Sequence, residues 1–211
     1  MNHIARSLPA ALALFLAGCP SVPEPAGGPT FRESGAFVEH VSSGMQFPRT
    51  LGVFSRTGVH QYDATGLDVS AGYNAADPAP VTITVYVYPS PRVVSLGSPD
   101  NVIADARRNL AQGAYRQVKG EILQLHRDVA TLSEREITTL VSGGSHFGYA
   151  GTFAYTEYYA GAVRPLHSLA FVYCYVGGKW TVAYRITYPA DSGAELVVDR
   201  FLSDLKWTIQ P

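Results

Sequence analysis

Two cysteines carry the most distinctive chemistry in the sequence, because a thiol can be acylated, oxidised or used as a nucleophile. They are Cys19 and Cys174. Cys19 directly follows the small residues Ala17 and Gly18, at the end of an apolar run that begins at Leu8. This order is typical of a cysteine that is modified after secretion. It leaves Cys174 without a partner for a disulfide within the chain.

The first 18 residues have the anatomy of a secretory signal peptide. Residues 1–7 carry one positive charge, at Arg6, and no acidic side chain, and residues 8–17 form the apolar run. A transmembrane helix needs roughly 20 apolar residues, which is about twice the length of this run. Residues 1–18 are therefore predicted to be removed rather than to span a membrane.

The motif Leu16-Ala17-Gly18-Cys19 resembles the lipobox of bacterial lipoproteins. The resemblance implies cleavage before Cys19 and acylation of its thiol, with palmitate among the fatty acids that could be attached. An ordinary signal peptide that happens to end near a cysteine is the alternative. Pro20 stands where lipoproteins of the inner membrane usually have Asp, which favours the outer membrane, facing the periplasm.

Residues 19–30 are predicted to tether a folded domain to the lipid. Residues 20–30 include four prolines and two glycines, a composition that forms neither a helix nor a strand ladder. A proline-rich chain extends by ~3 Å per residue, so the tether could reach up to roughly 35 Å from the bilayer. The remaining residues, 31–211, are predicted to fold as one domain.

A β-hairpin is the clearest structural signal in this domain. Residues 168–176 and 179–188 are rich in β-branched and aromatic side chains, and the Gly177-Gly178 link between them favours a primed turn. Such a turn fixes the register of the two strands. The expected pairs are Val176 with Lys179, Tyr175 with Trp180, Tyr173 with Val182, Phe171 with Tyr184, and Leu169 with Ile186.

The two faces of this hairpin differ in character. One face is aromatic and aliphatic and must be buried. The other is small and apolar at its centre, where Cys174 lies opposite Thr181 and where a helix could pack. Burial there predicts a neutral, structural thiol. Lys179 and Arg185 lie nearer the ends of this second face and are possible contacts for a partner.

Alternating and helical spacing predict the other elements. Alternation predicts strands near residues 49–56, 67–73, 81–88, 137–141, 149–155 and 207–209. Between residues 98 and 127 the spacing becomes helical, and the apolar stripe comprises Val102, Ala106, Leu110, Ala114, Val118, Ile122 and Leu125. A closing helix is expected after an Asp191-Ser192 cap, with Ala194, Val198, Phe201 and Leu205 facing inward.

The expected fold class is α+β, an antiparallel sheet flanked by a long central helix and a C-terminal helix. Its order is similar to the α/β/α sandwich of PsbP-like proteins, which include DcrB-like bacterial lipoproteins. The similarity covers residues 44–209 as an order of elements. It rests on the Gly177-Gly178-Lys179-Trp180 hairpin, the strand exit at residues 184–189, and Leu205-Lys206-Trp207. The resemblance implies binding rather than catalysis, and it carries over no active-site residue.

Motifs for catalysis, phosphate binding and metal binding are missing from the sequence. Asp191-Ser192-Gly193 lacks the flanking glycines of a protease nucleophile, and no Gly-x-Ser-x-Gly elbow occurs. The glycines do not fall at dinucleotide or P-loop spacing. The histidines form no ligand pair of the usual spacing, and only His60 and His126 have a nearby acid, Asp63 and Asp128. No cofactor and no metal are therefore expected.

Charge and composition narrow the function classes further. The formal net charge is −1, which gives no electrostatic reason to bind nucleic acid. The chain is expected to be a non-catalytic binding or structural module, with an envelope protein, a cell-wall component or a small ligand as partner. Tyr86 and Tyr88, on the threonine-bearing face of their strand, are expected to be partly exposed. The alternative is an envelope hydrolase whose site combines a histidine with Glu136 or Glu157.

Overall fold

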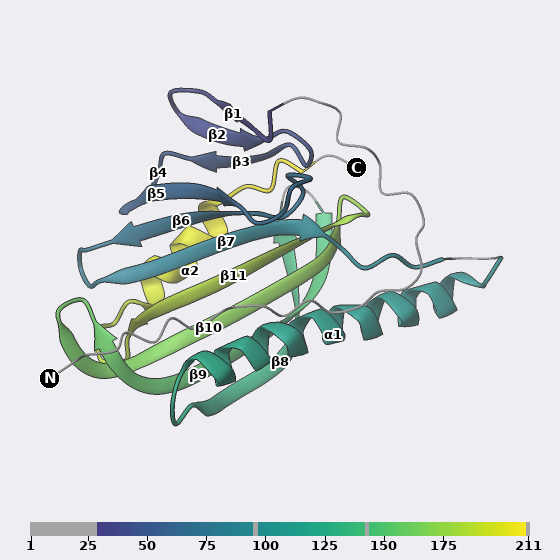
Figure 1. Ribbon diagram of the computed structural model, residues 1–211. Helices are drawn as coiled ribbons and strands as arrows, with labels where there is room; N and C mark the ends of the chain where they lie inside the picture. The colour runs from purple at the N-terminus through teal and green to yellow at the C-terminus, as the bar shows by residue number, and fades with distance from the viewer. Residues whose placement is uncertain (1–28, 95–96, 142–143, 210–211) are drawn as a thin grey trace, which may run out of the picture.

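Strands make up most of the fold. The computed structural model describes residues 29–94, 97–141 and 144–209, which form eleven strands and two helices (Figure 1). The elements are β1 (Phe31–Glu33), β2 (Phe37–His40), β3 (Met45–Pro48), β4 (Thr50–Leu51), β5 (Phe54–Gln61), β6 (Val69–Ala75), β7 (Val81–Pro89), α1 (Asp100–Leu125), β8 (Ala130–Val141), β9 (Gly144–Tyr159), β10 (Ala162–Val176), β11 (Trp180–Pro189) and α2 (Glu195–Asp204).

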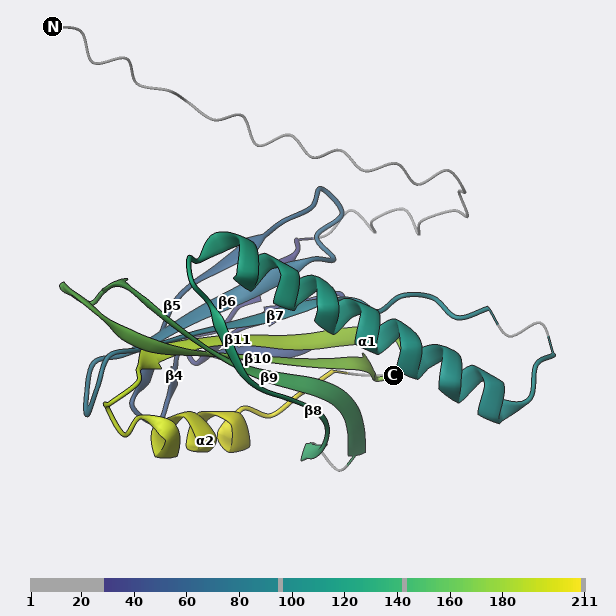
Figure 2. The same cartoon turned by 90° about the horizontal axis from the view of Figure 1, so that it is seen from below.

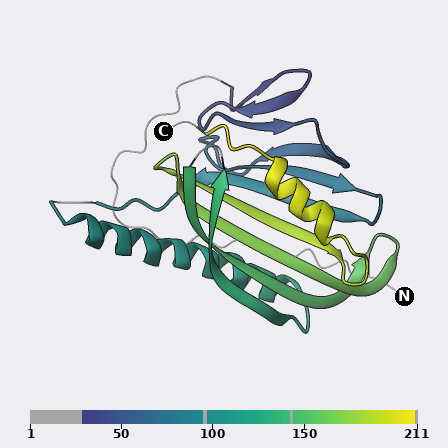
Figure 3. The same ribbon diagram turned by 180° about the vertical axis from the view of Figure 1, so that it is seen from behind.

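Eight strands form one antiparallel sheet in the order β4-β5-β6-β7-β11-β10-β9-β8, and β1, β2 and β3 form a separate small sheet. Figure 2 shows α1 on one side of the large sheet and α2 on the other, and Figure 3 shows α2 lying across its face. The α+β class, with a long central helix and a C-terminal helix flanking an antiparallel sheet, is confirmed. The small sheet and the full length of β8 and β9 were not predicted from the sequence.

Each face of the large sheet has its own core. On the α2 side, the ring of Phe201 lies 4.9 Å from that of Phe54 and 5.1 Å from that of Tyr73, measured between centroids. The fully buried Tyr184 accepts a 2.6 Å hydrogen bond from Nε1 of Trp207. On the α1 side the core is smaller and lies over β9, β10 and β11. Its buried members are Ala111, Tyr115, Ile122, Tyr149, Phe153, Ala170, Val172, Cys174 and Ala183.

The hairpin of β10 and β11 has the expected register along most of its length. As predicted, Phe171 pairs with Tyr184, Tyr173 with Val182, and Leu169 with Ile186. Tyr175 does not pair with Trp180, however, because a bulge brings Val176 into that place. The φ of Tyr175 is +61°, and that of Gly177 and Gly178 is +55° and +78°.

Hydrogen bonds to the segment after β7 explain this bulge. The Tyr175 backbone N–H donates to Ser90 Oγ at 2.9 Å, and its hydroxyl donates to the Pro91 carbonyl at 3.0 Å. A left-handed backbone costs a residue with a Cβ about 1–3 kcal/mol, which these two hydrogen bonds help to offset. Sequence alternation alone could not reveal this partner, which lies about 85 residues earlier in the chain.

The apolar stripe expected on α1 is only partly correct. Ile122 is buried as predicted, but Val102 and Leu125 are 49% and 70% exposed. The helix turns Ala111 and Tyr115 toward the sheet instead. The first turns of α1 extend beyond the sheet, so they have no surface to cover (Figure 1). What a helix packs against, rather than its own pattern alone, sets which side is buried.

The C-terminal helix packs as predicted, but the segments before and after it differ from the prediction. All four inward residues of α2 are buried: Ala194, Val198, Phe201 and Leu205. The Asp191-Ser192 cap was wrong, because α2 begins at Glu195 and the Ser192 hydroxyl donates to the Pro189 carbonyl at 2.6 Å. Residues 207–209 form no strand. Thr208 there binds the Gly44 carbonyl and the Gln46 N–H.

His40 is a fully buried histidine whose tautomer follows from its neighbours. Its Nε2 lies 2.7 Å from the Gly66 carbonyl, which can only accept, so Nε2 carries the hydrogen. The Ser43 hydroxyl then donates to Nδ1, 2.8 Å away. Burial lowers the pKa of His40 below its usual 6.5, although the Gly66 carbonyl and Asp63 act in the opposite direction. The neutral ring is therefore a structural link between β2 and the β5–β6 loop.

This geometry predicts a loss of stability in mild acid. Because the pKa of His40 is lower in the folded state, the unfolded state binds more protons below pH 6.5. The free energy of unfolding should then fall by up to about 1.4 kcal/mol per pH unit as the pH decreases from 6.5 toward the folded-state pKa. Urea denaturation at a series of pH values measures this slope, which should be shallower in His40→Gln.

His60→Gln is the matched control, because His60 is exposed on β5. It should keep the pH dependence of the native protein. A slope in His40→Gln equal to that of the native chain would show that His40 does not cause the acid sensitivity.

Candidate functional site

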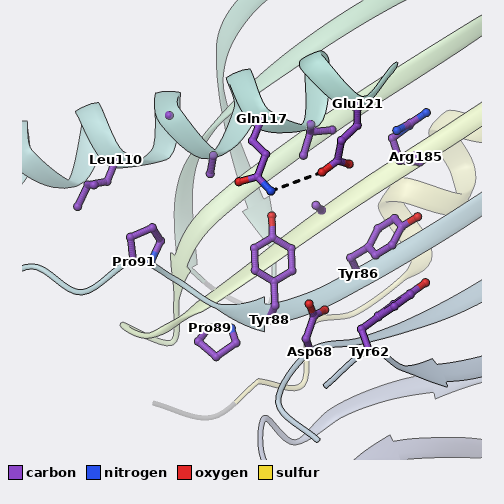
Figure 4. A pocket seen from close by; sticks show the side chains of 14 residues that line it. Tyr62, Asp68, Tyr86, Tyr88, Pro89, Pro91, Leu110, Gln117, Glu121 and Arg185 are labelled. Atoms are coloured by element: carbon purple, nitrogen blue, oxygen red, sulfur yellow. Dashed lines mark hydrogen bonds between the residues drawn. The ribbon is translucent and has the colours of Figure 1, made fainter. Parts of the chain in front are cut away.

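A cavity of about 750 Å³ lies between α1 and the large sheet, over β7 and β11. Figure 4 shows its side chains converging from the helix above and the strands below. Ligand pockets in proteins usually measure about 300–1,000 Å³, so the cavity could hold a small organic molecule.

Small residues create this space. Where α1 crosses β9 and β10, the large ring of Tyr115 stacks on Tyr149 with 5.8 Å between centroids. Over β7 and β11, by contrast, the helix presents Gly113 and Ala114, and the strand below presents Ala183. The helix is held away from the sheet on one side and has little side-chain volume to fill the gap on the other. An open cavity results.

Three tyrosines form the aromatic wall of the cavity. Tyr86 and Tyr88 are two residues apart on β7, so both point to the α1 side of the sheet. Tyr62 follows β5, and its ring centroid lies 6.2 Å from that of Tyr86 at an angle of 30°. Its hydroxyl is 3.0 Å from Ser70 Oγ, which holds the ring in place. The half-buried Tyr86 and Tyr88 agree with the sequence expectation.

Tyr86 and Tyr88 stay protonated at neutral pH. Burial raises the pKa of Tyr86, with a smaller contribution from Tyr62. Burial also raises the pKa of Tyr88, and the charges near it, including Asp68 and Glu121, add to the shift. The phenols can therefore donate hydrogen bonds and offer their ring faces, but they are not bases.

Two carboxylates and one guanidinium supply the charge. Asp68 stands immediately before β6, below Tyr88, and burial and the nearby Asp63 raise its pKa. Glu121 points down from α1, where Oε1 is 3.5 Å from Nε2 of Gln117 (Figure 4). Arg185 reaches the same cavity from β11. Its Nε is buried and has no hydrogen-bond partner within the part of the chain that the structure describes.

The site residues predicted from the sequence fall in different places. Arg185 lines the cavity, whereas Lys179 is exposed beside the β10–β11 turn, outside the cavity, and its carbonyl accepts a hydrogen bond from the Ser90 N–H. The lipidation motif Leu16-Ala17-Gly18 and Cys19 lie outside the described residues. Tyr62, Asp68, Gln117 and Glu121 were missed. They come from a loop and from the side of a helix, and no local pattern joins them.

The histidine and acid pairs considered in the sequence lie elsewhere. His126 Nδ1 is 2.9 Å from Glu157 Oε2, and its ring stacks on Tyr155 with 4.0 Å between centroids. Glu136 accepts a hydrogen bond from the Tyr149 hydroxyl at 3.1 Å. None of these residues lines the cavity. Asp63 binds Thr65 and the Leu67 N–H, as a loop residue does, rather than His60.

Two further findings concern the described residues only. Across residues 29–94, 97–141 and 144–209, no group of three or more His, Cys, Asp or Glu side chains could hold a metal ion. No helix in these ranges is long and apolar enough to cross a membrane.

Cys174 is buried, does not line the cavity, and is connected by hydrogen bonds to the segment after β7. A chain of donors runs from the Tyr175 N–H to Ser90 Oγ, from Ser90 to Thr181 Oγ1 over 2.8 Å, and from Thr181 to Cys174 Sγ over 3.5 Å. Burial raises the pKa of the Cys174 thiol, although Thr181 and Ser90 counteract part of this rise. The thiol is therefore neutral at physiological pH.

This environment predicts slow alkylation, because the thiolate is the reactive form. In a Cys19→Ser chain, maleimide should label native Cys174 at least about tenfold more slowly than it labels the urea-unfolded chain, because burial limits both the access of the reagent and the fraction of thiolate. Mass spectrometry over time gives both rates. Equal rates in the folded and unfolded chain would contradict the buried, structural assignment.

Comparison with known proteins adds no family to this geometry. No protein-family model matches the chain, and no curated protein matches it either. The chemistry of the cavity must therefore be interpreted from its own residues.

Proposed function

We propose that the protein is a membrane-tethered envelope lipoprotein whose domain binds a small ligand, without catalysis, in the cavity between α1 and the sheet. The single observation that carries the proposal is the cavity itself, with its tyrosine wall and the charged side chains of Asp68, Glu121 and Arg185.

The lining favours binding over chemistry. None of the described side chains that line the cavity is a His, Cys, Ser, Thr or Lys. The usual nucleophiles of acyl transfer and the commonest general base are thus missing from the set. Aromatic rings with a few polar groups are typical of small-molecule sites. The similarity of the element order to PsbP-like proteins agrees with a binding role and is part of the proposal.

A hydrolase is the second candidate, favoured by one observation. Asp68 and Glu121 approach Tyr88 from opposite sides, and glycoside hydrolysis uses two carboxylates that flank the bond to be cut (Figure 4). Burial raises the pKa of Asp68, which is the direction a general acid needs. Turnover of a glycoside by the native chain, lost in Asp68→Asn, would favour this candidate over the binding module.

Filling the cavity should abolish ligand binding. Gly113 lines the cavity, and a Cβ added there would meet no atom within 4 Å. Gly113→Trp should place an indole in the cavity and remove at least about 90% of binding, because the ligand and the indole compete for the same volume. Saturation-transfer NMR with a panel of water-soluble amines, sugars, amino acids and carboxylic acids measures this.

Gly120→Trp is the matched control. Gly120 is also in α1 and also has no atom within 4 Å of an added Cβ, but it does not line the cavity. Both changes replace a helical glycine, so their effects on helix stability should be similar. If compounds from the panel bind Gly113→Trp as well as they bind Gly120→Trp, the cavity is not the binding site. If no compound binds the native chain, the proposal fails.

The tether is tested separately through its cysteine. Cys19→Ser should stop the incorporation of labelled palmitate and move the protein out of the membrane fraction, because the acyl chains supply the membrane affinity at about 0.8 kcal/mol per buried methylene. Cys174→Ser is the control and should keep both the label and the membrane location. Density-gradient fractionation then tests the outer-membrane location. Palmitate incorporation by Cys19→Ser would overturn the lipoprotein assignment.

A further inference from the structure

We propose that the ligand of this cavity is an organic cation, carrying an ammonium group flanked by carbon substituents and next to a hydrogen-bond acceptor. The inference rests on the proposed function, because it names the ligand class of the same site. It follows from how charge, aromatic rings and apolar surface are distributed around the cavity.

The charge of the lining is negative overall. Asp68 and Glu121 contribute two carboxylates, against the single guanidinium of Arg185. The carboxylates come from opposite walls, one from the segment before β6 and the other from α1, and both point toward Tyr88 (Figure 4). Neither forms an ion pair with a described residue. A cavity with low-dielectric walls and unpaired negative charge concentrates cations.

The aromatic wall of the cavity also attracts cations. A ring face attracts a cation within about 6 Å of its centroid, and quaternary ammonium groups are bound in this way by several rings together. Tyr62, Tyr86 and Tyr88 supply three rings around the two carboxylates. Alkylated ammonium groups, unlike metal ions, also gain from contact with apolar surface. That surface is at the other end of the cavity, at Leu110, Pro89 and Pro91 (Figure 4).

Arg185 limits what else the ligand can carry. Its positive charge opposes a cation, while its guanidinium N–H groups can donate hydrogen bonds to an acceptor in the cavity. A hydroxyl, ether or carbonyl oxygen near the ammonium group would accept such a hydrogen bond. The carboxylates and the guanidinium therefore have opposite effects on a bound cation, which purely structural residues would not have. Removing the charge of a carboxylate should weaken binding of the cation, and removing the charge of Arg185 should strengthen it.

Choline and its neutral carbon isostere, in which carbon replaces the nitrogen, form a matched pair of probes. Titration calorimetry on the full chain carrying Cys19→Ser measures both. Choline should bind at least about tenfold more tightly than the isostere, a ratio in the range that cation–π contacts give. Glu121→Gln and Asp68→Asn should each raise the Kd for choline about threefold to tenfold, and Arg185→Gln should lower it.

Hexyltrimethylammonium tests the apolar end. It should bind more tightly than choline, and this gain should be lost in Gly113→Trp. Asp204→Asn is the charge control, because Asp204 is exposed on α2, across the sheet from the cavity. It should leave every Kd unchanged.

The possible failures are distinguishable. Equal binding of choline and its isostere, with both lost in Gly113→Trp, would overturn the cation assignment and leave the cavity as a binding site. So would tighter binding in Glu121→Gln, or preferential binding of neutral sugars from the panel. Absence of binding by all probes and by the whole panel would overturn both proposals together.

Discussion

Both faces of the central hairpin must be buried, and the rest of the structure depends on this constraint. One face of β10 and β11 carries large rings such as Tyr184, and the other carries small residues such as Ala170 and Ala183. A sheet that is apolar on both sides needs a covering layer on each. The aromatic face is covered by α2 and the residues of β3, and the small-residue face by α1.

The helices α1 and α2 pack differently against the large sheet, and this difference produces the cavity. On the α2 side, the ring of Phe201 contacts those of Phe54 and Tyr73 and fills the space between helix and sheet. On the α1 side, one long helix crosses the sheet and is fixed by Tyr115 and Ile122 over β9 and β10. Over β7 and β11 the helix presents Gly113 and Ala114, which do not fill the space above the sheet. The same sheet therefore has a filled face and a face with space for a ligand.

The parts of this fold that could be predicted from the sequence are those set by local periodicity. Phe171 and Tyr184 were paired correctly although three residues, and not two, connect the strands, because the bulge at Tyr175 restores the predicted register. Phe201 was placed inward because α2 is short and has one apolar side. Tyr175 and Val102 were wrong because their environment comes from distant segments, the strand exit after β7 and the end of the sheet. The cavity was missed for the same reason.

Unsatisfied buried donors help to separate a site from a packing defect. Four buried side-chain atoms in the described residues have no partner: Arg164 Nε, Ser168 Oγ, Trp180 Nε1 and Arg185 Nε. Ser168 is fully buried between paired strands, where a ligand has no access. Of the four, only Arg185 lines either of the two cavities found next to β7. An orphaned donor is equally costly in all these places. Nε of Arg185 is closed to water as well, but the Arg185 side chain also lines the cavity, which makes Arg185 the residue that connects the packing of this fold to recognition.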